Sequence, residues 1–360
     1  MERPDLYVID ESFGFCGVLD KYESLAWDRS LYECGSFQVE LQTNRPGADA
    51  VAVNRVVYDF NRPHMAGVIK RIEQDDERII VSGPMLKGIA KQRIVVPPDA
   101  DGAYGWDRIS GAAETVYKHY AAKHLAAPDD SNRALAQVVI APDRNRGIEL
   151  PWQNRFDVLA DVFKQIGEFT GMGWDIRLDL ANKHWVFDVV PGVDRTVGSE
   201  EPIIIDRASL AGVQYAIGIE NWVNAGYAGG AGEDEKRLIY TVFDGDIRQG
   251  LDRQEGFLDC GSLATVDDLI YEGKHQLKDF AREESLDAKH LENSIYRYGE
   301  DYDLGDLITI LMKDGRASNT RITGIKESYD SNGYSFDMET GTPSKDIKSE
   351  LYRIGKQVIR

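Results

Sequence analysis

Apolar residues at every second position recur along this 360-residue chain, and this alternation constrains its fold more than any other feature. Successive side chains of a β-strand point to opposite faces, so the alternation predicts strands with one buried face. The clearest run holds Phe37, Val39 and Leu41, and others fall within residues 6–41, 51–82, 201–265 and 307–338. The sequence therefore predicts a mainly β protein built from antiparallel hairpins.

The apolar spacing becomes helical in the middle of the chain, between residues 99 and 200. One predicted helical face holds Ile109, Ala113, Val116 and Tyr120, and a second holds Phe156, Leu159, Ala160, Phe163 and Ile166, with Asn154 as its expected cap. Residues 174–189 then alternate as a hairpin on which these helices can pack. We expect a compact α+β insert here.

Changes of period and breaks divide the chain into five predicted segments. Pro97 and Pro98 end the first run of strands, since consecutive prolines continue neither regular structure. Helical spacing returns from Val266 to Leu291 and again near the last residues. The predicted segments are a first β lobe (1–98), an α+β insert (99–200), a second β lobe (201–265 and 296–343), a helical insert (266–295) and an amphipathic terminal helix (344–360).

The chain is strongly acidic, with a formal net charge of -19 from 61 acidic and 42 basic residues. Such a surface repels nucleic acid and anionic membranes, which argues against a basic-patch DNA reader. The same repulsion suits a channel wall that must let DNA slide past without holding its phosphates.

The cysteines fit a protein that folds in a reducing cytoplasm, and the hydropathy bears on whether it has a signal peptide or a membrane span. Cys16, Cys34 and Cys260 are odd in number and have no metal-ligand spacing, so no disulfide framework is expected. No window approaches 18 apolar residues, and the first residues lack a basic start before an apolar run. We therefore predict neither a signal peptide nor a membrane-spanning segment.

Residues 220–260 predict a long antiparallel hairpin whose tip is rich in glycine and acid. A phosphate-binding loop is excluded, because Lys236 follows three acids and is not followed by Ser or Thr. An apolar side of the terminal helix has little of its own chain left to cover. The candidate interface residues are Gly229, Gly230, Glu233, Asp234, Glu235, Leu351 and Ile354.

No motif for catalysis, a cofactor or a metal is found. The acidic pairs fall at turns or helix starts, where solvation and capping explain them. The run holding Asp301, Asp303 and Asp306 departs from the EF-hand loop, so a solvated turn before a strand is favoured there, although the question of a calcium site stays open. His119 and His124 are five residues apart, the wrong spacing for one face of an α-helix, so a zinc site is disfavoured.

Several stretches, in this order, resemble the tail hub proteins of siphophages and related prophages. They are residues 22–27 with Arg29 and 35–37, residues 79–83 with Leu86 and 92–94, residues 221–237, and residues 305–309 through 320–323 to Gly341. Each motif is made of turns and strands, but their order makes the match specific. Together they span most of residues 20–343.

The resemblance implies two tube-like β-barrels per chain, each carrying an insert, with three chains placing six barrels around a channel. It implies a structural, non-enzymatic hub of a phage or prophage tail tip. As a homotrimer, this hub would contact the distal tail protein, the tail tube proteins and tip or fibre proteins, and DNA would pass through without binding. Such a protein is made and folded in the host cytoplasm and ends in the virion tail.

Two other classes of function stay open. A cell-wall hydrolase of the tail tip would use acids such as Glu233 or Asp303. A carbohydrate-binding β module for host attachment is favoured if aromatic side chains cluster on an exposed face.

Overall fold

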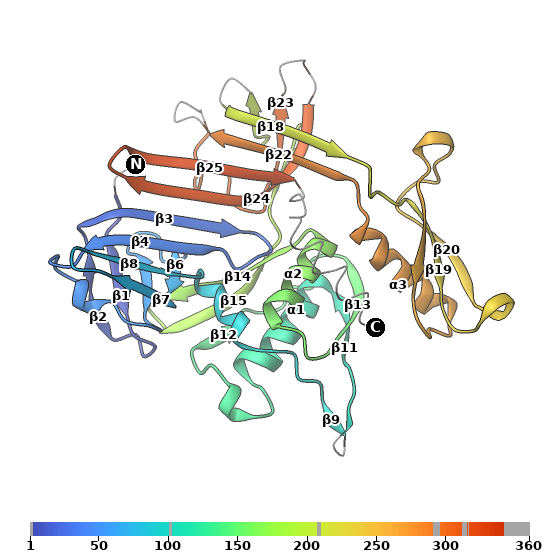
Figure 1. Ribbon diagram of the computed structural model, residues 1–360, viewed down its shortest axis with the longest axis horizontal. Helices are drawn as coiled ribbons and strands as arrows, with labels where there is room; N and C mark the ends of the chain where they lie inside the picture. Colours follow the sequence, from blue (N-terminus) through green and yellow to red (C-terminus); the bar gives the residue numbers. More distant parts are fainter. Residues whose placement is uncertain are drawn as a thin grey trace. The chain divides into compact units, whose positions relative to one another are not determined.

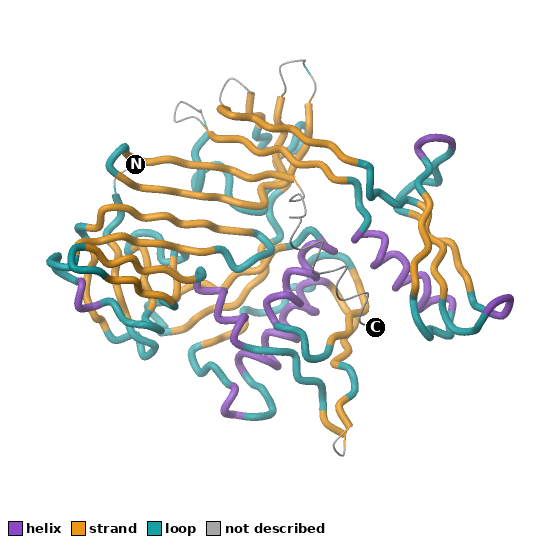
Figure 2. Tube along the Cα trace, viewed as in Figure 1, coloured by secondary structure: helices purple, strands orange, loops and turns teal. Residues whose placement is uncertain are grey.

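The computed structural model describes residues 3–100, 103–206, 210–290, 296–311, 315 and 317–341. The chain divides into two compact units, Met1–Val213 with Ala288–Thr340 (unit 1) and Gln214–Asp287 with Gly341–Arg360 (unit 2). Strands dominate both, with few helices (Figures 1 and 2). The predicted fold class, mainly β with an α+β part, is confirmed, while the five predicted segment boundaries stay a prediction.

The large sheet of unit 1 joins strands from distant parts of the sequence. Its strand order is β25-β24-β3-β4-β8-β7, which is made of three hairpins. The hairpins are β3 (Tyr22–Ser30) with β4 (Ser36–Gln42), β7 (Arg71–Gln74) with β8 (Arg78–Gly83), and β24 (Ala317–Asp330) with β25 (Gly333–Gly341). A side branch pairs β23 (Leu307–Leu311) with β24, β16 (Asp194–Arg195) and β17 (Ile204–Asp206). Two long strands, β18 (Leu210–Gly218) and β22 (Glu283–His290), pair with each other.

A smaller sheet packs against the large one. Its order is β2 (Phe15–Leu19), β1 (Leu6–Ile9), β5 (Val56–Asp59) and β6 (Ala66–Val68). The buried faces of the two sheets share one core, which includes Leu6, Val8, Leu19 and Val57 from the smaller sheet and Leu25, Trp27, Phe37 and Val39 from the larger. Alternating side chains thus bury one face of each strand, as the period-two pattern predicts.

The barrels implied by the family resemblance are not found among the described strands. Neither sheet has a pairing that returns it to its first strand. The sheets meet on one side, where the chain runs from β6 into β7 and Gly83 approaches Val68 closely. A Cβ atom on Gly83 would lie 1.9 Å from the Val68 carbonyl oxygen. Two sheets around a shared core, joined at one corner, form a sandwich.

The α+β part of unit 1 holds two helices and several short strands. The helices are α1 (Ala113–Ala121) and α2 (Leu159–Thr170); β11 (Asp107–Ala112) pairs with β13 (Glu149–Asn154), β9 (Asp99–Ala100) with β10 (Ala103–Tyr104), and β15 (His184–Val190) with both β12 (Val138–Ile140) and β14 (Gly173–Asp179). Tyr117, Phe163 and Phe187 lie in one core with Val56 and Tyr58 of the smaller sheet. This part therefore does not have a core of its own.

Local predictions in this part succeeded for the hairpin and partly failed for the helices. The hairpin at 174–189 is confirmed by the pairing of β14 with β15. Ile109, expected on a helix, lies in strand β11, and Asn154 lies in β13 rather than capping α2. The Asn154 side-chain amide donates to the Asp157 carboxylate at 2.9 Å, so its polar group is used before the helix begins.

The described part of unit 2 contains a three-stranded sheet covered on one face by α3 (Val266–Asp279). Strand β19 (Ala225–Gly229) lies between β20 (Ile239–Phe243), antiparallel to it, and β21 (Glu255–Asp259), parallel to it. The expected hairpin is therefore confirmed, with an added strand. Ala228, Val242 and Leu258 pack against Leu269 and Leu277 of α3, and Figure 1 shows this helix beside β19 and β20.

The predicted helical insert is shorter than expected. Thr265 caps α3, because its side-chain oxygen accepts from the Asp268 backbone N–H at 3.2 Å. The helix ends at Asp279, and the chain continues into strand β22. The helical spacing of Ala288 is misleading, because this residue lies in β22 and pairing with a distant strand overrides local periodicity.

We predict that Gly67→Ala destabilises unit 1 by about 2 kcal/mol, the usual cost of overpacking a core. A Cβ atom there would lie 2.1 Å from the Phe37 ring, inside the sandwich. Gly105→Ala is the matched control, since a Cβ atom at Gly105 has nothing within 4 Å. Urea denaturation followed by tryptophan fluorescence measures both, and equal stability of the two variants would contradict this packing.

Candidate functional site

The acidic tip of the β19–β20 hairpin is exposed in unit 2. Glu233, Asp234 and Glu235 all have exposed side chains, and Asp234–Lys236 forms a single 3-10 turn. None of the three carboxylates has an ion-pair partner within the part of the chain that the structure describes. Three negative charges are thus presented together on a short turn.

The two glycines of the candidate interface serve the packing of unit 2. A Cβ atom on Gly229 would lie 2.4 Å from Cζ of Phe257, so the bare backbone lets the Phe257 ring cross over β19. A Cβ atom on Gly230 would lie 2.4 Å from the Leu263 carbonyl oxygen and 2.8 Å from a Leu269 methyl group. Both glycines were expected in the loop, whereas Gly229 ends β19 and both pack against residues further along the chain.

Leu351 and Ile354, the other candidate interface residues, lie outside the described residues. The predicted terminal helix, 344–360, also lies outside them. The seven-residue interface therefore stays a prediction.

A buried charged cluster in unit 1 surrounds the Asp107 carboxylate. Nε2 of His119 lies 2.9 Å from its Oδ1, Nε2 of His124 lies 3.1 Å from its Oδ2, and Lys123 Nζ donates to Oδ1 at 3.0 Å. Burial raises the pKa of Asp107, but the hydrogen bonds from the two histidines and the lysine outweigh it and hold that pKa well below its usual range. The carboxylate is therefore charged and fixed.

A π turn brings His119 and His124 together. Helix α1 runs directly into the π-helical turn Ala122–Ala126, in which residues five apart face the same side. With α-helical spacing, the two histidines would lie on different faces of the helix. The two imidazoles share one carboxylate with an ammonium group, so we read the cluster as the anchor of β11 on α1.

A second buried cluster centres on Glu114, whose side chain has no exposed surface. Lys118 Nζ donates to Oε1 at 2.5 Å, and Arg146 donates to both carboxylate oxygens at 2.8 and 2.9 Å. Asp188 of β15 lies 3.0 Å from the same ammonium group. Burial raises the pKa of Glu114, but the hydrogen bonds from Arg146 and Lys118 prevail and lower it to about 2.

The acids considered for calcium binding accept hydrogen bonds from nearby groups among the described residues. Glu233, considered for hydrolysis, lies on the exposed turn of unit 2. Asp303 pairs with Arg29 at 3.0 Å, and Asp306 accepts from Arg195 at 3.0 Å and from the Val193 backbone at 2.8 Å. Asp301 accepts from the Arg297 backbone at 2.7 Å. Among the described residues no group of three or more acidic, histidine or cysteine side chains could hold a metal ion.

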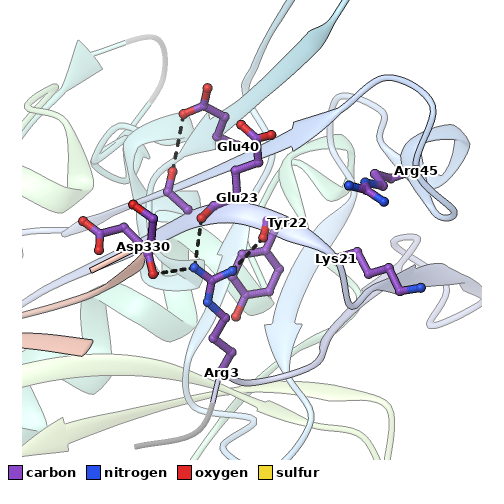
Figure 3. A pocket seen from close by; sticks show the side chains of 9 residues that line it. Arg3, Lys21, Tyr22, Glu23, Glu40, Arg45 and Asp330 are labelled. Carbon is purple, nitrogen blue, oxygen red and sulfur yellow. Dashed lines mark hydrogen bonds between the residues drawn. The ribbon is translucent and has the colours of Figure 1, made fainter. Parts of the chain in front are cut away.

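A pocket beside β3 contains side chains of both charges (Figure 3). Arg3 donates to the backbone oxygens of Tyr22 at 3.0 Å, Glu23 at 3.2 Å and Asp330 at 2.5 Å. Lys21 and Arg45 line the opposite side of the pocket (Figure 3). Because the Arg3 guanidinium is already bound by three carbonyl groups, it clamps β3 to the turn after β24.

The described helices include none long and apolar enough to cross a membrane.

The fold is that of prophage tail proteins. The 43 kDa tail protein of prophage MuSo2 from Shewanella oneidensis matches with a TM-score of 0.60 and 10% identity, over 93% of this chain and 98% of that one. Prophage tail protein gp18 from Listeria monocytogenes matches at 0.55 and 14% identity, over 99% and 100%. A tail protein from Neisseria meningitidis matches at 0.54 and 12% identity, over 93% and 95%.

The chain belongs to the siphovirus ReqiPepy6 Gp37-like protein family, whose model matches residues 5–342. The predicted relationship to siphophage tail proteins is thereby confirmed. No curated protein sequence matches the chain.

We predict that Glu114→Gln destabilises unit 1 by about 3 kcal/mol at pH 7, because it removes the buried negative charge that Lys118 and the partly buried Arg146 share. The wild-type contribution is fully present above pH 4.5, the ordinary pKa of a glutamate, and is lost as the pH falls towards about 2. Urea denaturation at several pH values measures this, and the variant should show a weaker loss between pH 4.5 and 2.

Glu73→Gln is the control for this prediction. Glu73 pairs with Arg71 on the surface, with both side chains more than half exposed, so its loss should cost less than about 1 kcal/mol. Equal effects of the two substitutions would show that the Glu114 cluster does not stabilise the α+β part.

Proposed function

We propose that this chain is a structural hub protein of a phage or prophage tail tip. In this role it links the tail tube and the distal tail ring to the tip and lines a channel for DNA. The observation that carries the proposal is the extent of the likeness to prophage tail proteins, at least 93% of this chain and 95% of each compared chain. A module shared between otherwise different proteins would leave much of them unmatched.

The proposed assembly is a homotrimer located in the virion tail, after synthesis and folding in the host cytoplasm. Its partners are the distal tail protein, the tail tube proteins and tip or fibre proteins. Each chain contributes two β lobes with inserts, at the segment boundaries predicted from the sequence but without closed barrels. The net charge of -19 supports the passage of DNA without binding, because acidic walls repel phosphates.

The acidic tip is the proposed contact with a neighbouring subunit or ring. Glu233, Asp234 and Glu235 are exposed and without ion-pair partners among the described residues, so basic groups across a boundary can pair with them. Gly229 and Gly230 hold the base of this hairpin in place, and Leu351 and Ile354 complete the proposed interface. A hydrolase gains no support from these acids, because Asp303 is paired with Arg29 and Glu233 lies on an exposed turn.

The oligomeric state tests the proposed assembly. Mass photometry of the purified chain should give a species of three times 40.4 kDa that also binds its distal tail protein. A chain that stays monomeric at high micromolar concentration by light scattering, and does not bind the distal tail protein, would contradict the proposal.

Charge reversal tests the acidic tip. The triple variant Glu233→Lys, Asp234→Lys, Glu235→Lys should lose the trimer or the passage of DNA, while its unfolding free energy changes by less than about 0.5 kcal/mol, as at other exposed sites. The control carries the same charge change on the exposed β7–β8 hairpin, as Glu73→Lys, Asp76→Lys and Glu77→Lys. Intact trimers and normal infectious yield from the tip variant would refute its role as an interface.

A further inference from the structure

The outer face of the unit 2 sheet carries a cluster of aromatic side chains. Residues paired across strands point to the same side of a sheet, so Tyr227, Phe243 and Phe257 share the face opposite α3. Ala228, Val242 and Leu258 point the other way, into the core under the helix. We call the side that carries Tyr227, Phe243 and Phe257 the aromatic face.

The Phe257 ring of the aromatic face is exposed to solvent, and Tyr227 and Phe243 are partly exposed. Phe257 is 56% exposed and crosses over Gly229, which has no side chain to displace it. The Arg237 guanidinium lies 5.1 Å from the centre of the Phe257 ring, and it also donates to the backbone oxygen of Gly230 at 3.1 Å. The Arg237 contact and the missing Gly229 side chain together set the position of the Phe257 ring over β19.

Paired polar groups border the rings. Arg237 donates to Asp259 at 2.6 Å, and Arg253 donates to Glu255 at 2.6 Å. The Tyr227 hydroxyl donates to the same Glu255 carboxylate at 3.3 Å. Each pair keeps a donor and an acceptor in a set position at the surface, with Asp259 and Glu255 about half or more exposed.

We propose that the aromatic face binds a neutral glycan. A sugar ring has a face of C–H groups, which contacts the negative face of an aromatic ring, and a rim of hydroxyls. Each hydroxyl both donates and accepts, so it matches guanidinium donors and carboxylate acceptors side by side. The positive charges of the two arginines balance the negative charges of the two carboxylates, which favours an uncharged ligand over a phosphate-rich one.

The size of the face also favours a short glycan over a protein partner. Three strands of five residues span about 17 Å by about 14 Å, or about 240 Å². A stable protein interface needs about 800 Å² from each partner. Two or three sugar rings fit the available area.

Saturation-transfer NMR on the full chain tests this proposal. The probes are glucose, galactose, N-acetylglucosamine and rhamnose, each added alone. At least one should receive saturation from the wild type, and Phe257→Ala should weaken its binding at least about fivefold, as expected for a central aromatic contact. Gly229→Ala should have a similar effect, because its methyl group displaces the Phe257 ring.

Phe15→Ala is the matched control, because Phe15 is a 66% exposed phenylalanine of unit 1. It should change sugar binding less than about twofold. The proposal is overturned if no sugar is saturated, or if the Phe15 and Phe257 variants lose binding equally. It is also overturned if Phe257→Ala abolishes binding to the distal tail protein while no sugar binds. None of these outcomes bears on the trimer, which mass photometry measures separately.

Discussion

The pairing of β3 with β24 is the contact on which unit 1 depends. It sets Leu25 beside Tyr329 and Ser30 beside Gly324, and so joins hairpins that lie far apart in the sequence. Arg62 ties β24 to the smaller sheet, since its guanidinium lies 2.9 Å from Glu327 of β24 and 2.8 Å from Asp59 of β5. Burial raises the pKa of Glu327, and the charge of Arg62 opposes that rise. The entropy cost of closing so long a loop is offset by the burial of a shared core rather than by local hairpins.

Features set by local sequence patterns could be predicted from the sequence, whereas features set by contacts between distant segments could not. Hairpins such as β14–β15 and β19–β20 follow from alternation and turn residues a few positions apart, and both were predicted. The meeting of β3 with β24 and the sandwich in place of barrels depend on partners that no local pattern specifies. Strand β22 was read as helix for the same reason, because its spacing fits a helical face while its partner strand lies elsewhere.

The candidate residues divide in the same way. The acidic tip was located correctly as an exposed turn, because glycines and acids mark such turns directly. The role of Gly229 could not be predicted, because it depends on Phe257, which reaches it through the parallel pairing of β21. His119 and His124 come together because of the π turn at Ala122–Ala126, which a five-residue spacing alone does not predict. The net charge thus predicts that the surface repels phosphates, whereas contacts such as Phe257 over Gly229 depend on the pairing of distant strands.

Electron cryo-microscopy of intact tails tests the central claim most directly. If the chain is a tail-tip hub, three copies should surround an open channel at the tip, between the distal tail ring and the fibre proteins. The acidic hairpins of unit 2 should then lie at a subunit boundary or along the channel. Density for this chain along the tail shaft, or particles that lack it altogether, would contradict the account.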